Sequence, residues 1–151
     1  MKTSTLPNPK HALLLVEDSP TEVQIVQRAL KDLGKPVHLC VVRDGQEAMD
    51  YLLGQGSFAE AKKSRPQLVL LDLNLPRLSG LDVLRHMRGH PDLRSLPVVL
   101  WSTSRKVEDI RAGYLAGANS FIEKPRDYKR FRDVLEGILH YWFESALLLP
   151  P

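Results

Sequence analysis

Acidic, hydroxyl and basic side chains directly follow four short apolar runs of this sequence. They are Glu17 and Asp18, Asp72, Ser102 and Thr103, and Lys124. Carboxylates that lie close together repel one another and raise each other's pKa unless a cation lies among them. Mg²⁺ prefers oxygen ligands of this kind and leaves room for a phosphoryl oxygen. If these runs end at one edge of a sheet, the residues predict a magnesium site that handles a phosphoryl group.

Each of these residues also has an ordinary structural explanation when it is considered alone. Acids after a strand can stabilise the dipole of the next helix, and Asp72 can be a turn residue. Lys124 can be a solvated loop lysine, and Ser102 can be no more than a helix cap. The four explanations together require a coincidence at one edge of the fold, so the joint functional interpretation is favoured.

Five apolar segments alternate with five helical patterns along the chain. The expected strands are 12–16, 37–42, 68–71, 98–101 and 120–122, and the expected helices are 20–33, 45–52, 80–88, 107–115 and 128–146. This alternation indicates an α/β fold with a five-stranded parallel sheet covered by helices on both faces. Right-handed crossovers favour a doubly wound topology, in which ligands bind outside the carboxyl ends of the strands.

The composition is that of one globular domain. The chain has 151 residues, of which 43% are hydrophobic and 26% charged, and its net charge is +3. It has no apolar run near the ~20 residues that span a bilayer, and its N-terminus has no secretory signal. We therefore expect a cytoplasmic protein that binds neither membrane nor, without a DNA-reading motif, nucleic acid.

The chain resembles the receiver domains of response regulators, the chemotaxis-regulator-like family, over nearly its whole length. The shared motifs are Val16-Glu17-Asp18, Leu71-Asp72-Leu73-Asn74-Leu75-Pro76, Gly80, Ser102-Thr103 and Lys124-Pro125. The stretch before the third strand is longer than in the minimal fold, and the last helix is rich in Trp and Phe. In both respects the chain is similar to the single-domain regulators that work with phytochrome-type sensor kinases.

The resemblance implies a flavodoxin-like fold with the strand order 2-1-3-4-5 and a stand-alone response regulator of a two-component phosphorelay. Asp72 is then the phospho-acceptor for a sensor histidine kinase, which this resemblance suggests is a phytochrome, and Mg²⁺ is the cofactor. The chain is accordingly a signalling protein that catalyses its own phosphorylation and dephosphorylation, not an enzyme with a separate substrate. The implied Mg²⁺ ligands are Asp18, Asp72, the backbone carbonyl of Asn74 and, through water, Glu17.

The resemblance also implies the residues that convert phosphorylation into a change of surface. Ser102 hydrogen-bonds the phosphoryl group, with Thr103 beside it as a competitor for that role. Lys124 pairs with Asp72 and then with the phosphoryl oxygens. Phe121 occupies the switch-aromatic position, and the surface of the fourth helix, fifth strand and fifth helix changes.

The ends of the chain carry further expectations. Residues 1–10 are expected to be a flexible leader, 11–147 the receiver domain with an extended C-terminal helix, and 148–151 a short tail, without an output domain. The last helix has more apolar surface than one sheet face readily covers. Trp142, Phe143 and Leu147 are therefore interpreted as a partner surface that forms a homodimer.

Three other functions fit these residues less well. A flavin- or nucleotide-binding module would offer a glycine-rich loop after the first strand, whereas Glu17 and Asp18 there would repel phosphate. A phosphohydrolase with an aspartyl intermediate typically has a second acid two residues after the nucleophile, where this chain has Asn74. A scaffold that is never phosphorylated does not need the set of acids, hydroxyl and lysine.

Overall fold

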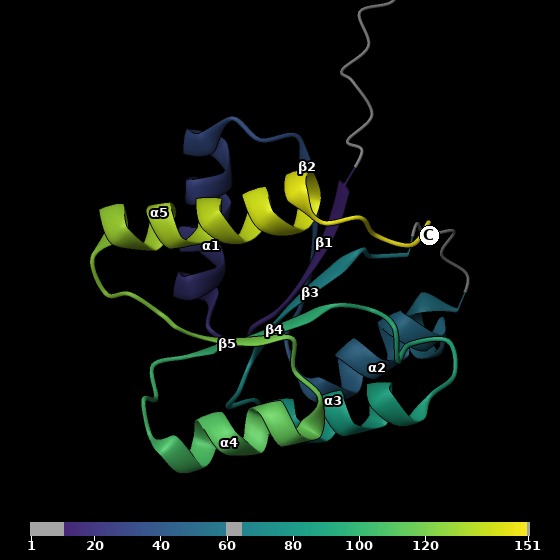
Figure 1. Cartoon of the computed structure of the whole chain (residues 1–151). Helices are drawn as coiled ribbons and strands as arrows, with labels where there is room; N and C mark the ends of the chain where they lie inside the picture. The colour runs from purple at the N-terminus through teal and green to yellow at the C-terminus, as the bar shows by residue number, and fades with distance from the viewer. Residues whose placement is uncertain (1–10, 60–64, 151) are drawn as a thin grey trace, which may run out of the picture.

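The structure is a computed structural model that describes residues 11–59 and 65–150, and it consists of a sheet with helices on both faces (Figure 1). The strands are β1 (His11–Val16), β2 (Val37–Val42), β3 (Leu68–Asp72), β4 (Val98–Ser102) and β5 (Ser120–Glu123). The helices are α1 (Pro20–Leu33), α2 (Gly45–Leu53), α3 (Gly80–Gly89), α4 (Val107–Ala116) and α5 (Tyr128–Leu139). A 3₁₀ turn, Gly56–Phe58, follows α2, and a π-helical segment, η2 (His140–Ser145), follows α5.

All five strands are parallel and lie in the order β2-β1-β3-β4-β5, which confirms the predicted fold class. The register places Val16 beside Leu71, and Asp72 beside Trp101. Strands β1, β3 and β4 therefore end at the same edge of the sheet. The polar residues that follow them in the sequence must lie at this edge.

Side chains that alternate along the strands form two separate cores. Leu14 and Val16 of β1 face α2 and α3, whereas Leu13 and Leu15 face α1 and α5. Successive side chains of a strand point to opposite faces, so a strand buried on both sides is a continuous apolar run. The run 12–16 has this composition and leads directly into Glu17.

The helices begin where the sequence predicts. The Ser19 hydroxyl accepts the Glu22 N–H at 3.3 Å at the start of α1, and the Ser79 hydroxyl accepts the Asp82 N–H at 3.1 Å at the start of α3. Gly34 ends α1 with φ = 64°, a conformation that glycine adopts without strain. These caps fix where α1 and α3 leave the polar edge of the sheet.

The last helical segment differs from the expected single helix over 128–146. Helix α5 ends at Leu139, and η2 continues with wider turns, in which the Ala146 N–H donates to the Tyr141 carbonyl at 2.7 Å. The change of helical period turns Phe143 inward, where it stacks on His11 with ring centroids 4.5 Å apart. Phe143 is buried in the α1–α5 core, which corrects its interpretation as a partner-surface residue.

Candidate functional site

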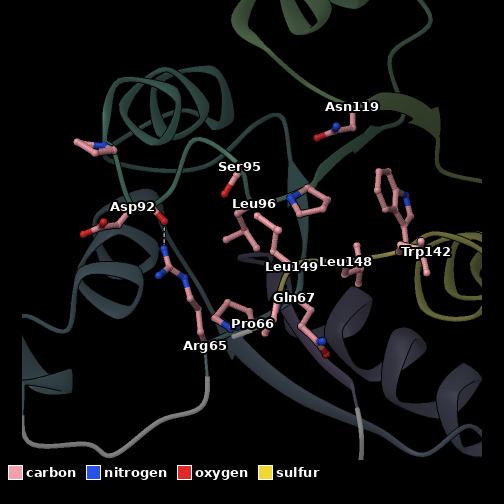
Figure 2. Close-up of a pocket in the computed structure, with 14 residues that line it drawn as sticks. Arg65, Pro66, Gln67, Asp92, Ser95, Leu96, Asn119, Trp142, Leu148 and Leu149 are labelled. Carbon is pink, nitrogen blue, oxygen red and sulfur yellow. Dashed lines mark hydrogen bonds between the residues drawn. The ribbon is translucent and has the colours of Figure 1, made fainter.

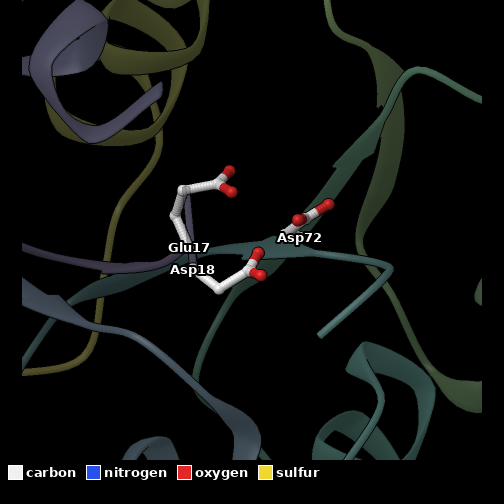
Figure 3. Close-up of side chains that lie close together, drawn as sticks. All are labelled: Glu17, Asp18 and Asp72. Carbon is white, nitrogen blue, oxygen red and sulfur yellow. The ribbon is translucent and has the colours of Figure 1, made fainter. Parts of the chain in front are cut away.

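Three carboxylates meet at the carboxyl edge of the sheet. Glu17 and Asp18 directly follow β1, and Asp72 is the last residue of β3. One carboxylate oxygen from each lies within 4.8 Å of the others (Figure 3). Glu17 and Asp72 are buried, whereas Asp18 is exposed. The structure thus brings together the three acids that the sequence placed at one edge.

Lys124 lies among these carboxylates and is itself buried. Its Nζ is 2.9 Å from Glu17 Oε1 and 3.3 Å from Asp72 Oδ1. A third carboxylate, that of Glu22 in the first turn of α1, is 2.6 Å away. The sequence around Glu22 indicates a helix start and does not reveal this contact. The sequence feature that could have indicated this contact is the position of Glu22, one helical turn after Asp18.

Burial raises the pKa of the two interior acids. Burial lifts the pKa of Glu17 from 4.5 to about 7, although the Lys124 ammonium opposes the change. Burial also raises the pKa of Asp72, opposed by Lys124 and by a hydrogen bond from the Asn74 backbone N–H. Burial alone would lower the pKa of Lys124, but Glu22, Asp72 and Glu17 together raise it. One ammonium therefore offsets only part of the negative charge at this edge.

Without divalent cations, we expect the free energy of unfolding to fall as the pH rises from about 4.5 to about 7. In this range folded Glu17 still binds a proton that the unfolded chain has released, so rising pH favours unfolding. The raised pKa of Asp72 acts in the same direction. Urea denaturation in EDTA across this range should show a shallower fall for Glu17→Gln.

The matched control is Glu108→Gln, which changes an exposed acid in the first turn of α4. This variant should keep the pH dependence of the unmodified protein. A Glu17→Gln variant with the full dependence would contradict the assignment of the titration to Glu17.

Hydroxyl groups lie at the end of β4. Ser102 is buried, and its Oγ accepts the Ser104 N–H at 3.0 Å. The Ser104 hydroxyl donates in turn to Asp109 Oδ2 at 2.5 Å, which ties this loop to the first turn of α4. Thr103 is exposed. Ser102 is therefore the hydroxyl directed into the protein, and Thr103 faces solvent.

Two aromatic side chains flank the polar cluster on opposite faces of the sheet. Trp101 is buried beside Phe131, and Lys124 Nζ lies 5.8 Å from its ring centroid. Phe121 is partly buried against the opposite core, and its backbone N–H donates to the Tyr114 hydroxyl at 3.2 Å. The backbone of Phe121 thus links β5 to α4.

The donor set of Glu17, Asp18 and Asp72 fits a hard divalent cation. It contains only carboxylate oxygens, without the nitrogen or sulfur ligands that zinc sites typically use. The exposed position of Asp18 leaves one side of the cluster open to water and to a phosphoryl oxygen. The geometry is therefore suited to Mg²⁺.

The predicted partner surface lies at the opposite edge of the sheet. Trp142 and Leu147 line a cavity of about 500 Å³ with Gln67 and Pro97, which precede β3 and β4 (Figure 2). Trp142 is partly buried in the α1–α5 core, and Leu147 is fully exposed. No helix in the described part of the chain is long and apolar enough to cross a membrane.

Comparisons with known proteins agree with this geometry. The response regulator receiver domain, as a sequence family, matches residues 13–136. Response regulator Rcp1 of Synechocystis sp. is 38% identical over 93% of this chain and 95% of its own length. Chemotaxis protein CheY-3 of Vibrio cholerae is 31% identical over 87% of this chain and 93% of its own length.

Solved structures with the same arrangement include two response regulators. The crystal structure of the phosphorylated cyanobacterial phytochrome response regulator RcpA has a TM-score of 0.85 at 38% identity, covering 91% of this chain and 97% of that one. The Mn²⁺-bound form of Rcp1 has a TM-score of 0.83 at 37% identity, covering 92% and 99%. The chain therefore belongs to the response-regulator receiver domains, the signalling domains of two-component systems.

Proposed function

We propose that Asp72 accepts a phosphoryl group from a sensor histidine kinase. The observation that carries this proposal is the convergence of Glu17, Asp18 and Lys124 on the Asp72 carboxylate. An Asp72 oxygen attacks the phosphorus of a phosphohistidine, and a new P–O bond forms. The P–N bond breaks, the imidazole keeps its electron pair, and the product is an acyl phosphate on Asp72.

Positioning and neutralisation of charge supply most of the catalysis of phosphoryl transfer. Lys124 Nζ lies 3.3 Å from the Asp72 carboxylate. Its ammonium would therefore be close enough to pair with the phosphoryl oxygens and to stabilise their negative charge. Asp18 and Asp72 would hold Mg²⁺ directly, with the Asn74 backbone carbonyl and, through water, Glu17. When bound, Mg²⁺ would neutralise charge on the equatorial phosphoryl oxygens. Water later hydrolyses the acyl phosphate, so the chain catalyses its own phosphorylation and dephosphorylation.

The same proposal assigns a switch to Ser102 and Phe121. In the unphosphorylated protein the Ser102 hydroxyl accepts the Ser104 N–H. A phosphoryl oxygen on Asp72 offers the Ser102 hydroxyl a stronger, charged acceptor, so Ser102 moves toward it. Phe121 then turns into the space that Ser102 leaves, and the surface of α4, β5 and α5 changes. Thr103, which is exposed, has a minor role in this switch.

The proposed kinase partner is a phytochrome-type histidine kinase in the cytoplasm. The similarity to RcpA supports this proposal, because RcpA is described as a phytochrome response regulator and is 38% identical to this chain. We further propose that the receiver domain spans 11–147 and forms a homodimer. Trp142 and Leu147, which line the cavity at the opposite edge of the sheet, are the proposed contact residues.

The test is phosphate incorporation from acetyl phosphate, a small donor that replaces the kinase. With Mg²⁺ we expect one phosphate, which peptide mass spectrometry should locate on Asp72. With EDTA we expect incorporation to fall to background, because Glu17, Asp18 and Asp72 would then repel the donor. Incorporation that is equal with EDTA, or that maps to another residue, would contradict the proposal.

A further inference from the structure

Glu22 contacts the site lysine more closely than either interior acid does. Its Oε1 lies 2.6 Å from Lys124 Nζ, compared with 2.9 Å for Glu17 and 3.3 Å for Asp72. The Glu22 side chain is 37% exposed, whereas that of Glu17 is 1% exposed. Glu22 is therefore the one acid among these partners of Lys124 that retains substantial contact with solvent.

An ammonium group has three N–H donors and no acceptor. In the structure the three carboxylates of Glu17, Glu22 and Asp72 occupy the space around the Lys124 ammonium. One phosphoryl oxygen can take over the 3.3 Å contact with Asp72, and a second one that pairs with Lys124 must replace Glu17 or Glu22. Glu17 is buried and would keep only the Ser19 N–H at 3.2 Å, without a charged partner, which is unfavourable for a buried carboxylate. The partly exposed Glu22 carboxylate can instead be hydrated without a change in its position.

We propose that Glu22 is a positioning residue that holds Lys124 in the unphosphorylated protein and releases it to the phosphoryl group. This inference rests on Asp72 as the phospho-acceptor. The negative charge that arrives on Asp72 repels Glu22 and attracts Lys124, so both effects favour the exchange. Glu22 thus opposes phosphorylation before it occurs, and its release changes the charge presented by the first turn of α1.

The chain offers a matched control for this residue. Glu22 and Asp82 are both the third residue of a helix whose serine cap accepts their backbone N–H. Both carboxylates interact with a helix dipole in the same way. Asp82 pairs with Arg85 on α3 at 3.5 Å and is not among the contacts of Lys124. Differences between Glu22→Gln and Asp82→Asn therefore report the contact with Lys124.

We expect Glu22→Gln to be phosphorylated by acetyl phosphate about two- to fivefold faster than the unmodified protein, the range for one partly exposed ion pair. Asp82→Asn should keep the original rate. Equal rates for Glu22→Gln and the unmodified protein, with phosphate still incorporated, would overturn the inference alone. Absence of phosphate from every variant would instead overturn the role of Asp72.

A spectroscopic measurement separates release of Lys124 from a general structural effect. The ¹³C resonance of the Glu22 carboxylate should shift when beryllofluoride and Mg²⁺, which mimic the phosphoryl group, are added. The Lys124 ¹⁵Nζ resonance should shift with it, and the Asp82 carboxylate should not. A Glu22 resonance that stays in place while that of Asp72 shifts would show that Glu22 keeps its contact and would overturn the inference.

Discussion

The Asp72→Asn variant should incorporate no phosphate from acetyl phosphate and should still fold. A carboxamide is not a nucleophile for phosphorus under these conditions, so the loss should be complete. The fold should tolerate the change because Lys124 keeps Glu17 at 2.9 Å and Glu22 at 2.6 Å. Removing one of several crowded, partly desolvated negative charges should even raise the melting temperature in EDTA. Mass spectrometry and thermal denaturation check the two effects on the same sample.

The two measurements together distinguish loss of the acceptor from misfolding. A variant that loses phosphorylation because it is misfolded would also lose its thermal transition. Ser104→Ala is a useful companion, because it removes the hydroxyl bonded to Asp109 and leaves the Asp72 carboxylate in place. Retained incorporation in Asp72→Asn, mapped to Asp18 or Glu17, would show that another acid is the acceptor.

Gly80→Ala should destabilise the protein by about 2–3 kcal/mol, the magnitude of an overpacked interior. A Cβ at Gly80 would lie 2.3 Å from the Asp72 carbonyl oxygen and 2.9 Å from Leu73 Cα. Both are backbone atoms, so the start of α3 must move away from the segment that carries Asp72. The Gly80 N–H also donates to the Leu73 carbonyl at 2.9 Å, and this bond would be stretched. Urea denaturation measures the loss.

Gly89→Ala, at the other end of α3, is the control for helix propensity. A Cβ at Gly89 meets no described atom within 4 Å. Alanine favours a helix by up to about 1 kcal/mol over glycine, so this variant should be as stable as the original or more stable. If both variants had the same stability, the close approach of α3 to Asp72 would not be the cause.

The positions of Glu17, Asp18, Asp72 and Lys124 could be predicted because they depend on short-range rules. Continuous apolar runs mark the buried strands, and parallel strands joined by right-handed crossovers end at one edge of the sheet. Each of these residues lies within two positions of a strand end, so its location needs no knowledge of helix packing. The caps of α1 and α3 were confirmed for the same reason, whereas the strand order, also confirmed, was implied by the resemblance to receiver domains.

The contact of Glu22 and the inward turn of Phe143 depend on tertiary packing, and sequence analysis missed both. Glu22 meets Lys124 because the folded chain brings the first turn of α1 beside the residue that follows β5. The change from α-helix to π-helix after Leu139 follows Gly137, but no glycine or proline within 138–149 marks the new period. Phe143 stacks on His11, which lies far earlier in the chain, and this contact accompanies the change of period. Such long-range contacts cannot be deduced from local spacing.

Trp101 gives the site an optical consequence. Trp101 is the neighbour of Asp72 in the register of β3 and β4, and the centroid of its buried ring lies 5.8 Å from Lys124 Nζ. Its indole N–H has no hydrogen-bond partner among the described residues. The emission of an indole changes when a nearby charge moves, especially where little water screens it. Displacement of Lys124 would therefore alter the intrinsic fluorescence of the protein, so each turn of the signalling cycle can be followed in real time without an attached dye.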